Sequence, residues 1–401
     1  MDGRQFRAEN LKPVRKAGSP TVEGPMRVHI VMPLAEQRGG AEKMLQHLLA
    51  NSPGDQVAWC VTFLENGPLV DWAADRKIPV SVVNAGRLRS PLAYAGAVSQ
   101  LVKQVRQWQP DLLFSWMTKA QLYAGVAARV VGVPAVWFNH TITDRGALDR
   151  IATLLPARWV AVPSKVAAEA QAALPGSPPC KVIYPGIDLR DFRAELLPPP
   201  AAVREELQIP EDRLLVGTVA RLQRWKGVHI FLQAVALASQ TVPNLHAMVV
   251  GGSHFSEPDY PDELRQLATQ LGISDRVTFT GHRQDVPRLM NAFDIFVHAS
   301  SLPEPGGMTN MEAMALGKPV IATRAGGPTE VVADGETGIL VLPNNVEVMA
   351  DGLLRLVSQP ELGRRFGRAA IERVQRHFSA EVMAQRVVAL ARETAGRGGA
   401  A

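Results

Sequence analysis

The chain has 401 residues, of which 46% are hydrophobic and 20% are charged, and this length predicts two or three domains with sizeable cores. The apolar content excludes disorder over most of the chain, and no apolar run reaches the roughly 18–20 residues that a membrane span needs. The first residues lack the apolar stretch of a secretory signal, and two cysteines cannot build a disulfide framework. We therefore expect a cytoplasmic protein in a reducing compartment.

The net charge of +5 is unevenly distributed along the chain. Residues 1–190 contain 22 Lys and Arg against 14 Asp and Glu, whereas residues 191–401 contain 21 against 24. The sequence has no zinc motif, RNA-binding motif or basic–aromatic array, which argues against a nucleic-acid partner. The basic excess of the first half leaves two interpretations open: peripheral contact with an anionic membrane at the inner face of the plasma membrane, or scattered surface charge.

Short apolar runs alternate with helical patterns over the first half of the chain. Residues 1–25 lack an apolar period and are predicted to form a flexible tail. Helices are predicted at 41–50 and 91–108, and strands at 28–32, 57–63, 78–83, 111–115, 135–138, 159–162 and 181–184. Short apolar strands separated by helices are typical of a parallel sheet covered on both faces.

The alternation stops at residues 189–210, where Pro198, Pro199 and Pro200 favour a stiff, extended linker. It resumes with predicted strands at 214–220, 245–250, 277–279, 294–298 and 319–323, and with helices at 228–239, 262–271, 310–316 and 380–394. The predicted fold class is α/β, with two facing Rossmann-like, doubly wound parallel-sheet domains and a cleft between them. The predicted divisions are a tail at 1–25, an N-terminal domain at 26–190, a linker at 191–213, a C-terminal domain at 214–378, and a closing helix and tail at 379–401.

The most informative segment for function follows the strand predicted at 294–298. Glu304 and Glu312 stand eight residues apart, the first in a loop and the second about one turn into a helix, where it could accept hydrogen bonds from a polyol such as a ribose. Two lone acids would more often be solvated surface residues, but Gly306 lets the backbone approach a ligand closely, which favours a binding site. The helix N-terminus is suited to bind an anion through free backbone N–H groups, those of Gly307, Met308 and Thr309.

Two cations, Arg221 and Lys226, lie between the strand predicted at 214–220 and the helix that follows. The planar guanidinium of Arg and the point charge of Lys can both neutralise a diphosphate leaving group. Two solvated cations in a loop are an equally good reading of this segment alone. The position of this segment relative to the Glu304 segment favours a role for the two cations in binding the diphosphate.

Three weaker segments complete the predicted cleft. Gly39 and Gly40 form a turn before a helix and could present N–H groups to a phosphate or a sugar, although glycine pairs also simply make turns. His140 ends a strand of the first domain and is expected to contact a sugar, with a purely structural histidine as the alternative. His282 and Arg283 would border the base of a nucleotide or form an ordinary strand-to-helix turn. The sequence contains no DxD pair, so leaving-group charge would be met by side chains and backbone rather than by a metal.

In these motifs the sequence resembles the family-4 retaining glycosyltransferases of the GT-B fold. The resemblance runs from about residue 26 to the final helix. It rests on the E-x7-E element, the Arg221–Lys226 pair, the turn at 39–42, His140 and the crossover at 184–188. The family usually has an aromatic residue two positions after the first Glu, where this chain has Gly306. That departure affects the fit of the donor sugar rather than the nucleotide site.

The resemblance implies a role for each of these residues. The C-terminal domain would hold a nucleotide-activated sugar, with Glu312 on the ribose, Glu304 on the donor sugar, and the amides of residues 307–309 on phosphate and sugar hydroxyls. Arg221 and Lys226 would stabilise the leaving diphosphate. His140, Gly39 and Gly40 would approach from the opposing domain, to which the final helix crosses back. The anomeric configuration would be retained by front-face attack, with the leaving phosphate taking the acceptor's proton.

We therefore expect a hexosyltransferase that uses a UDP- or GDP-sugar, with no further cofactor and no metal, to build a cell-envelope glycan on a glycan or lipid-linked acceptor. Two alternatives remain open. One is a sugar phosphorylase or nucleotide-sugar epimerase on the same fold, and the other is a GT-B scaffold that binds a partner without catalysis. The intact set of two cations and two acids argues against an idle scaffold, because such a cleft has no physical need for them.

Overall fold

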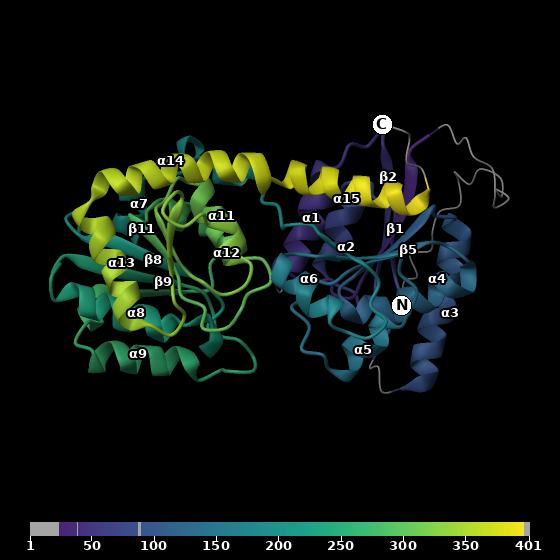
Figure 1. Ribbon diagram of the computed structural model, residues 1–401, viewed down its shortest axis with the longest axis horizontal. Helices are drawn as coiled ribbons and strands as arrows, with labels where there is room; N and C mark the ends of the chain where they lie inside the picture. Colours follow the sequence, from purple (N-terminus) through teal and green to yellow (C-terminus); the bar gives the residue numbers. More distant parts are fainter. Residues whose placement is uncertain (1–23, 38, 87–89, 397–401) are drawn as a thin grey trace.

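The structure, a computed structural model, describes residues 24–37, 39–86 and 90–396 and consists of two α/β domains joined side by side (Figure 1). Most of the tail expected at 1–25 and the last residues of the segment at 379–401 lie outside these described residues. In both sheets, every pair of neighbouring strands is parallel. The predicted fold class of two doubly wound domains is confirmed.

The N-terminal domain contains a seven-stranded sheet in the order β3-β2-β1-β4-β5-β6-β7. Its strands are β1 Met26–Met32, β2 Val57–Phe63, β3 Val80–Val82, β4 Leu112–Trp116, β5 Ala135–Phe138, β6 Trp159–Val162 and β7 Cys180–Val182. Its helices are α1 Gly40–Asn51, α2 Pro68–Asp75, α3 Pro91–Trp108, α4 Thr118–Val131, α5 Ala147–Thr153 and α6 Lys165–Ala172. The central strands are buried along nearly their whole length, which explains why they form continuous apolar runs in the sequence.

The C-terminal domain repeats this plan in a six-stranded sheet with the order β10-β9-β8-β11-β12-β13. Its strands are β8 Leu214–Val219, β9 Leu245–Val250, β10 Val277–Gly281, β11 Ile295–His298, β12 Val320–Thr323 and β13 Gly338–Val341. Its helices are α8 Val228–Ser239, α9 Tyr260–Gln270, α10 Val286–Asn291, α11 Met308–Ala315, α12 Pro328–Val331, α13 Val346–Ser358 and α14 Pro360–His377. Adjacent residues of one strand enter different cores, as Phe296 and Val297 of β11 do, because side chains alternate between the two faces of a sheet.

The strand order fixes where each domain can bind a ligand. The order reverses at β1, which lies between β2 and β4, and again at β8, which lies between β9 and β11. Doubly wound sheets bind ligands beyond the carboxyl ends of the strands at such a reversal. The segments that follow β1, β8 and β11 contain Gly39 and Gly40, Arg221 and Lys226, and Glu304, respectively.

The segment expected to form an extended linker is folded. It contains the 3-10 helices η1 Leu189–Phe192 and η2 Ala194–Leu196 and the α-helix α7 Pro200–Glu206. Pro200 stands in the first turn of α7, where the missing N–H costs nothing and the fixed φ suits a helix. Val203 and Ile209 are buried in the core of the C-terminal domain. The proline run therefore starts a packed helix instead of a stiff spacer.

The chain passes between the domains twice, and the two passages are tied together. Helix α15 Ala380–Ala395 runs back along the N-terminal domain (Figure 1, yellow) and buries Met383 and Val387 in the core that contains β1. At the crossing, the Ile187 N–H donates to the Phe378 carbonyl at 3.0 Å and the Ala380 N–H donates to the Ile187 carbonyl at 2.8 Å. A methyl group on Gly186 would come within 2.6 Å of the Ser379 carbonyl oxygen, so glycine permits the close approach of the two passages.

Candidate active site

The ends of β8 and β11 bring Lys226 and Glu304 into contact. Lys226 ends the 3-10 helix η3 Arg224–Lys226, and its ammonium forms an ion pair with Glu304 Oε1. The next residue, Gly227, has φ +67°, and a Cβ at this position would lie 1.9 Å from the Ala299 carbonyl oxygen. Only glycine can therefore join η3 to α8 at this distance from the end of β11. The glycine sets the position of the lysine that precedes it.

Three donors meet a single oxygen of Glu304. Besides Lys226, His298 Nε2 lies 2.9 Å from Oε1, and the Ser300 hydroxyl donates to the same oxygen at 2.5 Å. The Glu304 side chain is buried, and burial alone would raise the pKa of its carboxyl. Electrostatic attraction to Lys226 and His298, together with the hydrogen bonds from both residues, outweighs burial and holds that pKa well below its usual value. Glu304 is therefore an ionised carboxylate with one oxygen fully engaged.

The loop that follows Glu304 leads into the N-terminus of α11. Gly307 precedes the helix with φ +70°, and no side chain caps the helix N-terminus. This arrangement leaves the N–H groups of Gly307, Met308 and Thr309 as candidates for binding an anion. One turn further, Glu312 is buried, and its Oε1 lies 3.3 Å from Nζ of Lys43 in α1 of the other domain. The two domains therefore meet at the predicted ribose site.

The glycine turn of the N-terminal domain lies against this helix. A Cβ built on Gly40 would come within 2.9 Å of the Met308 sulfur, so the backbone of the first turn of α1 touches α11. Gly39 precedes α1, whose N-terminus also lacks a side-chain cap. The sequence predicts that Gly39 and Gly40 close over an anion, and the structure brings Gly40 against Met308 at the start of α11.

His140 stands just beyond β5 in the N-terminal domain. Its ring stacks on Phe138 with centroids 4.1 Å apart and lies 4.6 Å from the ring of Trp116. Burial lowers the pKa of His140 to about 3, so the imidazole is neutral at physiological pH. No described residue forms a hydrogen bond with either ring nitrogen. A buried imidazole without partners is available for a hydroxyl that is both donor and acceptor, such as that of a sugar.

The remaining predicted residues have different surroundings. Arg221 follows β8, is exposed and forms no ion pair with any described residue, so its charge is available to a ligand. His282 is also exposed, and its Cβ lies beside Gly252 at the end of β9. Arg283, by contrast, pairs with Asp285 at 2.7 Å and with Glu206 of α7 at 3.0 Å. Its guanidinium ties α7 to the segment that follows β10.

Gly306 lies at the second contact between the domains. A Cβ on Gly306 would come within 2.7 Å of Pro185 Cγ and 3.8 Å of Pro163 Cβ. From the sequence, a glycine at this position is expected to affect the fit of the donor sugar, because the family usually has an aromatic residue there. In the structure the prolines of the crossover and of the segment after β6 occupy this side of the loop, so glycine here allows the domains to approach.

Glu330 of α12 reinforces the same contact. Its carboxylate accepts hydrogen bonds from the Lys165 backbone N–H, at 2.8 and 3.0 Å, and from the Tyr184 hydroxyl at 2.9 Å. Lys165 is the first residue of α6, where a carboxylate is favourable to the helix dipole. Burial raises the pKa of Tyr184 to about 12, and the hydrogen bond to Glu330 acts in the same direction, so the hydroxyl stays a donor.

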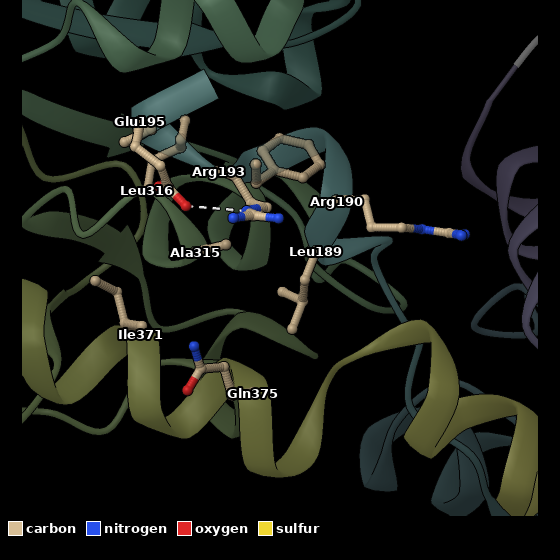
Figure 2. A pocket seen from close by; sticks show the side chains of 10 residues that line it. Leu189, Arg190, Arg193, Glu195, Ala315, Leu316, Ile371 and Gln375 are labelled. Atoms are coloured by element: carbon tan, nitrogen blue, oxygen red, sulfur yellow. Dashed lines mark hydrogen bonds and ion pairs between the residues drawn. The ribbon is translucent and has the colours of Figure 1, made fainter. Parts of the chain in front are cut away.

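A pocket of about 360 Å³ lies away from this cleft, at the opposite end of α11 (Figure 2). Ala315 and Leu316 line it together with residues of η1, η2 and α14, and Arg193 and Glu195 form an ion pair at its edge. Its two arginines, Arg190 and Arg193, are already paired with carboxylates.

Within the described ranges, no group of three His, Cys, Asp or Glu residues could hold a metal ion.

Four residues of the cleft are not predicted from the sequence. His298 ends an apolar strand and reads as a core residue, while Ser300 lies in a loop without a motif. Lys43 and Glu330 act across the domain boundary, where spacing along the chain gives no signal. The position of His298 at the carboxyl end of β11 is the one feature that could have identified it.

Two facing Rossmann-like domains with glycine turns, cations and carboxylates at the strand ends define a class of proteins that bind nucleotide-linked ligands between domains. Two family models match this chain: "Glycosyltransferase Family 4" over residues 38–191 and "Glycosyl transferases group 1" over residues 201–373. Together they cover most of the sequence. The chain belongs to the family-4 glycosyltransferases of the GT-B fold.

Relatives and solved structures agree with this assignment. The D-inositol 3-phosphate glycosyltransferase of Stackebrandtia nassauensis is 31% identical over 66% of this chain and 64% of its own length. The Corynebacterium urealyticum protein of the same name is 35% identical over 45% of this chain and 43% of its own length. The chain therefore spans less than two thirds of the length of these relatives.

Among solved structures, Anabaena Alr3699/HepE in complex with UDP and glucose has a TM-score of 0.81 at 28% identity, covering 92% of this chain and all of that chain. The same Anabaena protein in complex with UDP-glucose has a TM-score of 0.79. A glycosyltransferase from Rickettsia africae shares the fold, with a TM-score of 0.82 at 19% identity over 93% of this chain and all of that chain.

Proposed function

We propose that this protein is a retaining glycosyltransferase that transfers a hexosyl unit from a nucleotide-sugar to a glycan or lipid-linked acceptor in cell-envelope biosynthesis. The observation that carries the proposal is the buried Glu304–Lys226 pair beside the uncapped N-terminus of α11. The Glu304 carboxylate for the sugar, and the Lys226 cation and the α11 amides for the diphosphate, then lie in neighbouring loops at the carboxyl ends of β8 and β11. The likeness to Anabaena Alr3699/HepE, crystallised with UDP-glucose, favours a UDP-hexose over a GDP-hexose as donor.

The residues of the C-terminal domain would hold the donor and its leaving group. Glu312 would accept hydrogen bonds from the ribose, and the amides of residues 307–309 would bind the diphosphate and sugar hydroxyls. Lys226 and Arg221 would stabilise the negative charge that develops on the diphosphate as the glycosidic bond breaks. Because these groups already supply the compensating charge, we propose that transfer needs no metal, which an unchanged rate in excess chelator would support.

The N-terminal domain would supply the acceptor side. His140, which is neutral and has no hydrogen-bond partner among the described residues, would contact a hydroxyl of the donor sugar and orient it toward the acceptor. Gly39 and Gly40 would cover the diphosphate from the side of the N-terminal domain. The acceptor hydroxyl would attack the anomeric carbon on the face that the diphosphate leaves, and the departing phosphate oxygen would take the acceptor's proton. Configuration at the anomeric carbon is then retained.

We also propose that the N-terminal domain contacts an anionic membrane surface from the cytoplasmic side. No helix in the described part of the chain has both the length and the apolar character that a membrane-spanning helix requires. Helix α5 and the residue that follows it, however, expose three apolar side chains spaced three residues apart, those of Leu148, Ile151 and Leu154, with exposed fractions of 52%, 52% and 71%. Arg145 and Arg150 are exposed beside them. Such a combination favours an anionic bilayer surface.

Liposome co-sedimentation tests this part of the proposal. The wild-type protein should pellet with vesicles that contain phosphatidylglycerol and stay in solution with phosphatidylcholine alone. The variant Leu148→Ser/Ile151→Ser should lose recovery with the anionic vesicles. Leu237→Ser, which alters an exposed leucine of the C-terminal domain, is the matched control and should bind as the wild type does. Equal recovery of the wild type with both lipids would overturn membrane contact.

Donor turnover tests the central proposal. A panel of UDP-, GDP- and ADP-hexoses is scored by thermal shift, because a ligand that binds only the folded state raises its apparent stability. The donors that bind are then assayed for nucleotide release and for the anomeric configuration of the product by NMR. Glu304→Gln should lower turnover by two or more orders of magnitude while UDP affinity changes little. Unchanged turnover in Glu304→Gln, or release that needs free phosphate as acceptor, would overturn the assignment.

A further inference from the structure

We propose that His298 and Ser300 are positioning residues that keep Glu304 oriented while Lys226 serves the donor diphosphate. The inference rests on the proposed function, because it concerns the carboxylate that would contact the donor sugar. It assigns a function to two side chains that belong neither to the Glu304–Glu312 element nor to the Arg221–Lys226 pair. The question it answers is why three donors converge on one oxygen of a buried carboxylate.

The geometry separates the two oxygens of Glu304. Oε1 accepts hydrogen bonds from Lys226 Nζ, His298 Nε2 and the Ser300 hydroxyl. No described residue donates to Oε2. One oxygen is therefore used to hold the side chain in place, and the other is left for a ligand. A carboxylate held by a single donor could rotate about its terminal bond and exchange its oxygens, whereas convergent donors fix its plane.

Charge compensation explains why Lys226 alone is not enough. If Lys226 turns to a phosphate oxygen, Glu304 loses its strongest partner while remaining buried. An ionised carboxylate without partners in a buried site is strongly unfavourable, so it would take up a proton or move. His298 and Ser300 continue to donate to Oε1 in that situation. They allow one lysine to serve the diphosphate without releasing the carboxylate.

Both positioning residues are fixed by the sheet. His298 is the last residue of β11 and pairs in register with Ala322 of β12. The Ser300 carbonyl accepts a hydrogen bond from the Thr323 hydroxyl at 2.8 Å, which ties the loop to the end of β12. His298 and Ser300 are 5% and 1% exposed, respectively. Groups mounted on a rigid strand end can hold a side chain more accurately than groups on a mobile loop.

The test compares steady-state transfer from the donor identified above in three variants. His298→Ala should lower kcat about 10- to 100-fold while the donor KM and UDP affinity change less than threefold, because the donor site itself is intact. His298→Gln places an amide donor close to the former Nε2 and should recover most of the lost kcat. Ser300→Ala, which removes only a hydroxyl and should fold normally, should lower kcat in the same way but less.

The matched control is His246→Ala. His246 is 6% exposed in β9 of the same domain and its Nε2 lies 2.9 Å from a threonine hydroxyl, but it stands near the amino end of its strand, away from the cleft. This control should retain kcat. Wild-type kcat in both His298→Ala and Ser300→Ala, or an equal loss in His246→Ala, would overturn the positioning role while leaving the proposed function intact. A wild-type protein that turns over no nucleotide-sugar would overturn the proposed function and this inference with it.

Discussion

Lys43 Nζ lies 3.3 Å from Glu312 Oε1, and this ion pair joins the first helix of one domain to the helix that follows β11 in the other. The carboxylate that we assign to the ribose is therefore occupied by a side chain of the opposing domain. Lys43 is partly exposed whereas Glu312 is buried, so the carboxylate carries most of the desolvation. A nucleotide that binds Glu312 would share it with Lys43 or displace the lysine.

Glu312→Ala is expected to weaken UDP binding about tenfold or more, because it removes acceptors for the ribose hydroxyls. Lys43→Met is the matched variant, since it removes the cation and leaves the carboxylate in place. A partly exposed ion pair contributes about 0–1 kcal/mol, so Lys43→Met should change the dissociation constant less than about fivefold. Isothermal titration calorimetry with UDP measures both variants. Equal losses would assign the effect to the ion pair rather than to the ribose.

His140→Phe is expected to lower kcat about 10- to 100-fold, because it removes both hydrogen-bonding atoms and keeps an aromatic ring against Phe138 and Trp116. Its free energy of unfolding should rise or stay constant, since no described residue bonds to the imidazole. Urea unfolding and donor turnover are measured on the same preparation. A purely structural histidine would give the opposite pattern, with lost stability and unchanged kcat.

Gly306→Ala is expected to lower the free energy of unfolding by about 1–3 kcal/mol through overpacking, because its methyl group would lie 2.7 Å from Pro185 Cγ. Pro185→Ala removes that atom, so the cost of Gly306→Ala should be smaller in the Pro185→Ala background. A double-mutant cycle by urea unfolding gives the interaction energy directly. Additive effects of the two substitutions would contradict the contact.

Asn310→Leu is expected to raise the free energy of unfolding by about 1–2 kcal/mol. Asn310 is fully buried in α11, and neither its amide nitrogen nor its amide oxygen has a partner among the described residues. Replacing such a group by an apolar side chain of similar size removes a desolvation penalty. Asn139→Leu is the control with the opposite sign, because Asn139 bonds to Gln171 and Thr141 and its loss should destabilise. A destabilised Asn310→Leu would indicate that this amide has a bound partner.

Acid is expected to destabilise the protein through its buried histidines. Burial lowers the pKa of His29 to about 4, while an unfolded histidine titrates near 6.5. Between these values the unfolded chain binds a proton that the folded chain does not, so stability falls as the pH falls from about 6.5 to about 4. His29→Gln should reduce the slope of the unfolding free energy against pH by up to roughly 1.4 kcal/mol per pH unit. Urea unfolding at a series of pH values checks this, and an unchanged slope would contradict it.

The sequence predicts the central strands of each sheet well because these strands are buried on both faces. Residues 57–63, 135–138 and 159–162 are predicted as strands with the bounds that the structure has, since a parallel strand must be apolar along its whole length. The segment at 191–213 is the main error. A proline at the start of a helix and one inside an extended linker have the same local composition, and only the burial of Val203 and Ile209 distinguishes them.

The site is predictable where its residues directly follow the carboxyl end of a strand. Lys226 follows β8 and Glu304 follows β11, and although they lie 78 residues apart they meet because these two strands are neighbours in the sheet. Contacts between the domains are not encoded in any local pattern. The approach of Pro185 to Gly306, the pairing of Lys43 with Glu312 and the bonds of Glu330 depend on how two separately folded units dock. Arg283, which resembles a ligand-binding cation in the sequence, forms an ion pair with Glu206 of α7 within the C-terminal domain, 77 residues away along the chain.

The hydrogen bonds that join Ile187 to residues 378 and 380 have a mechanical consequence. Two connections that are hydrogen-bonded to each other at one place would act as a single hinge, which would favour rotation of the domains over sliding. Motion about this hinge would separate Lys43 from Glu312 and Glu330 from Lys165. We expect any opening of the cleft to be a rotation about this hinge, opposed by these cross-domain contacts.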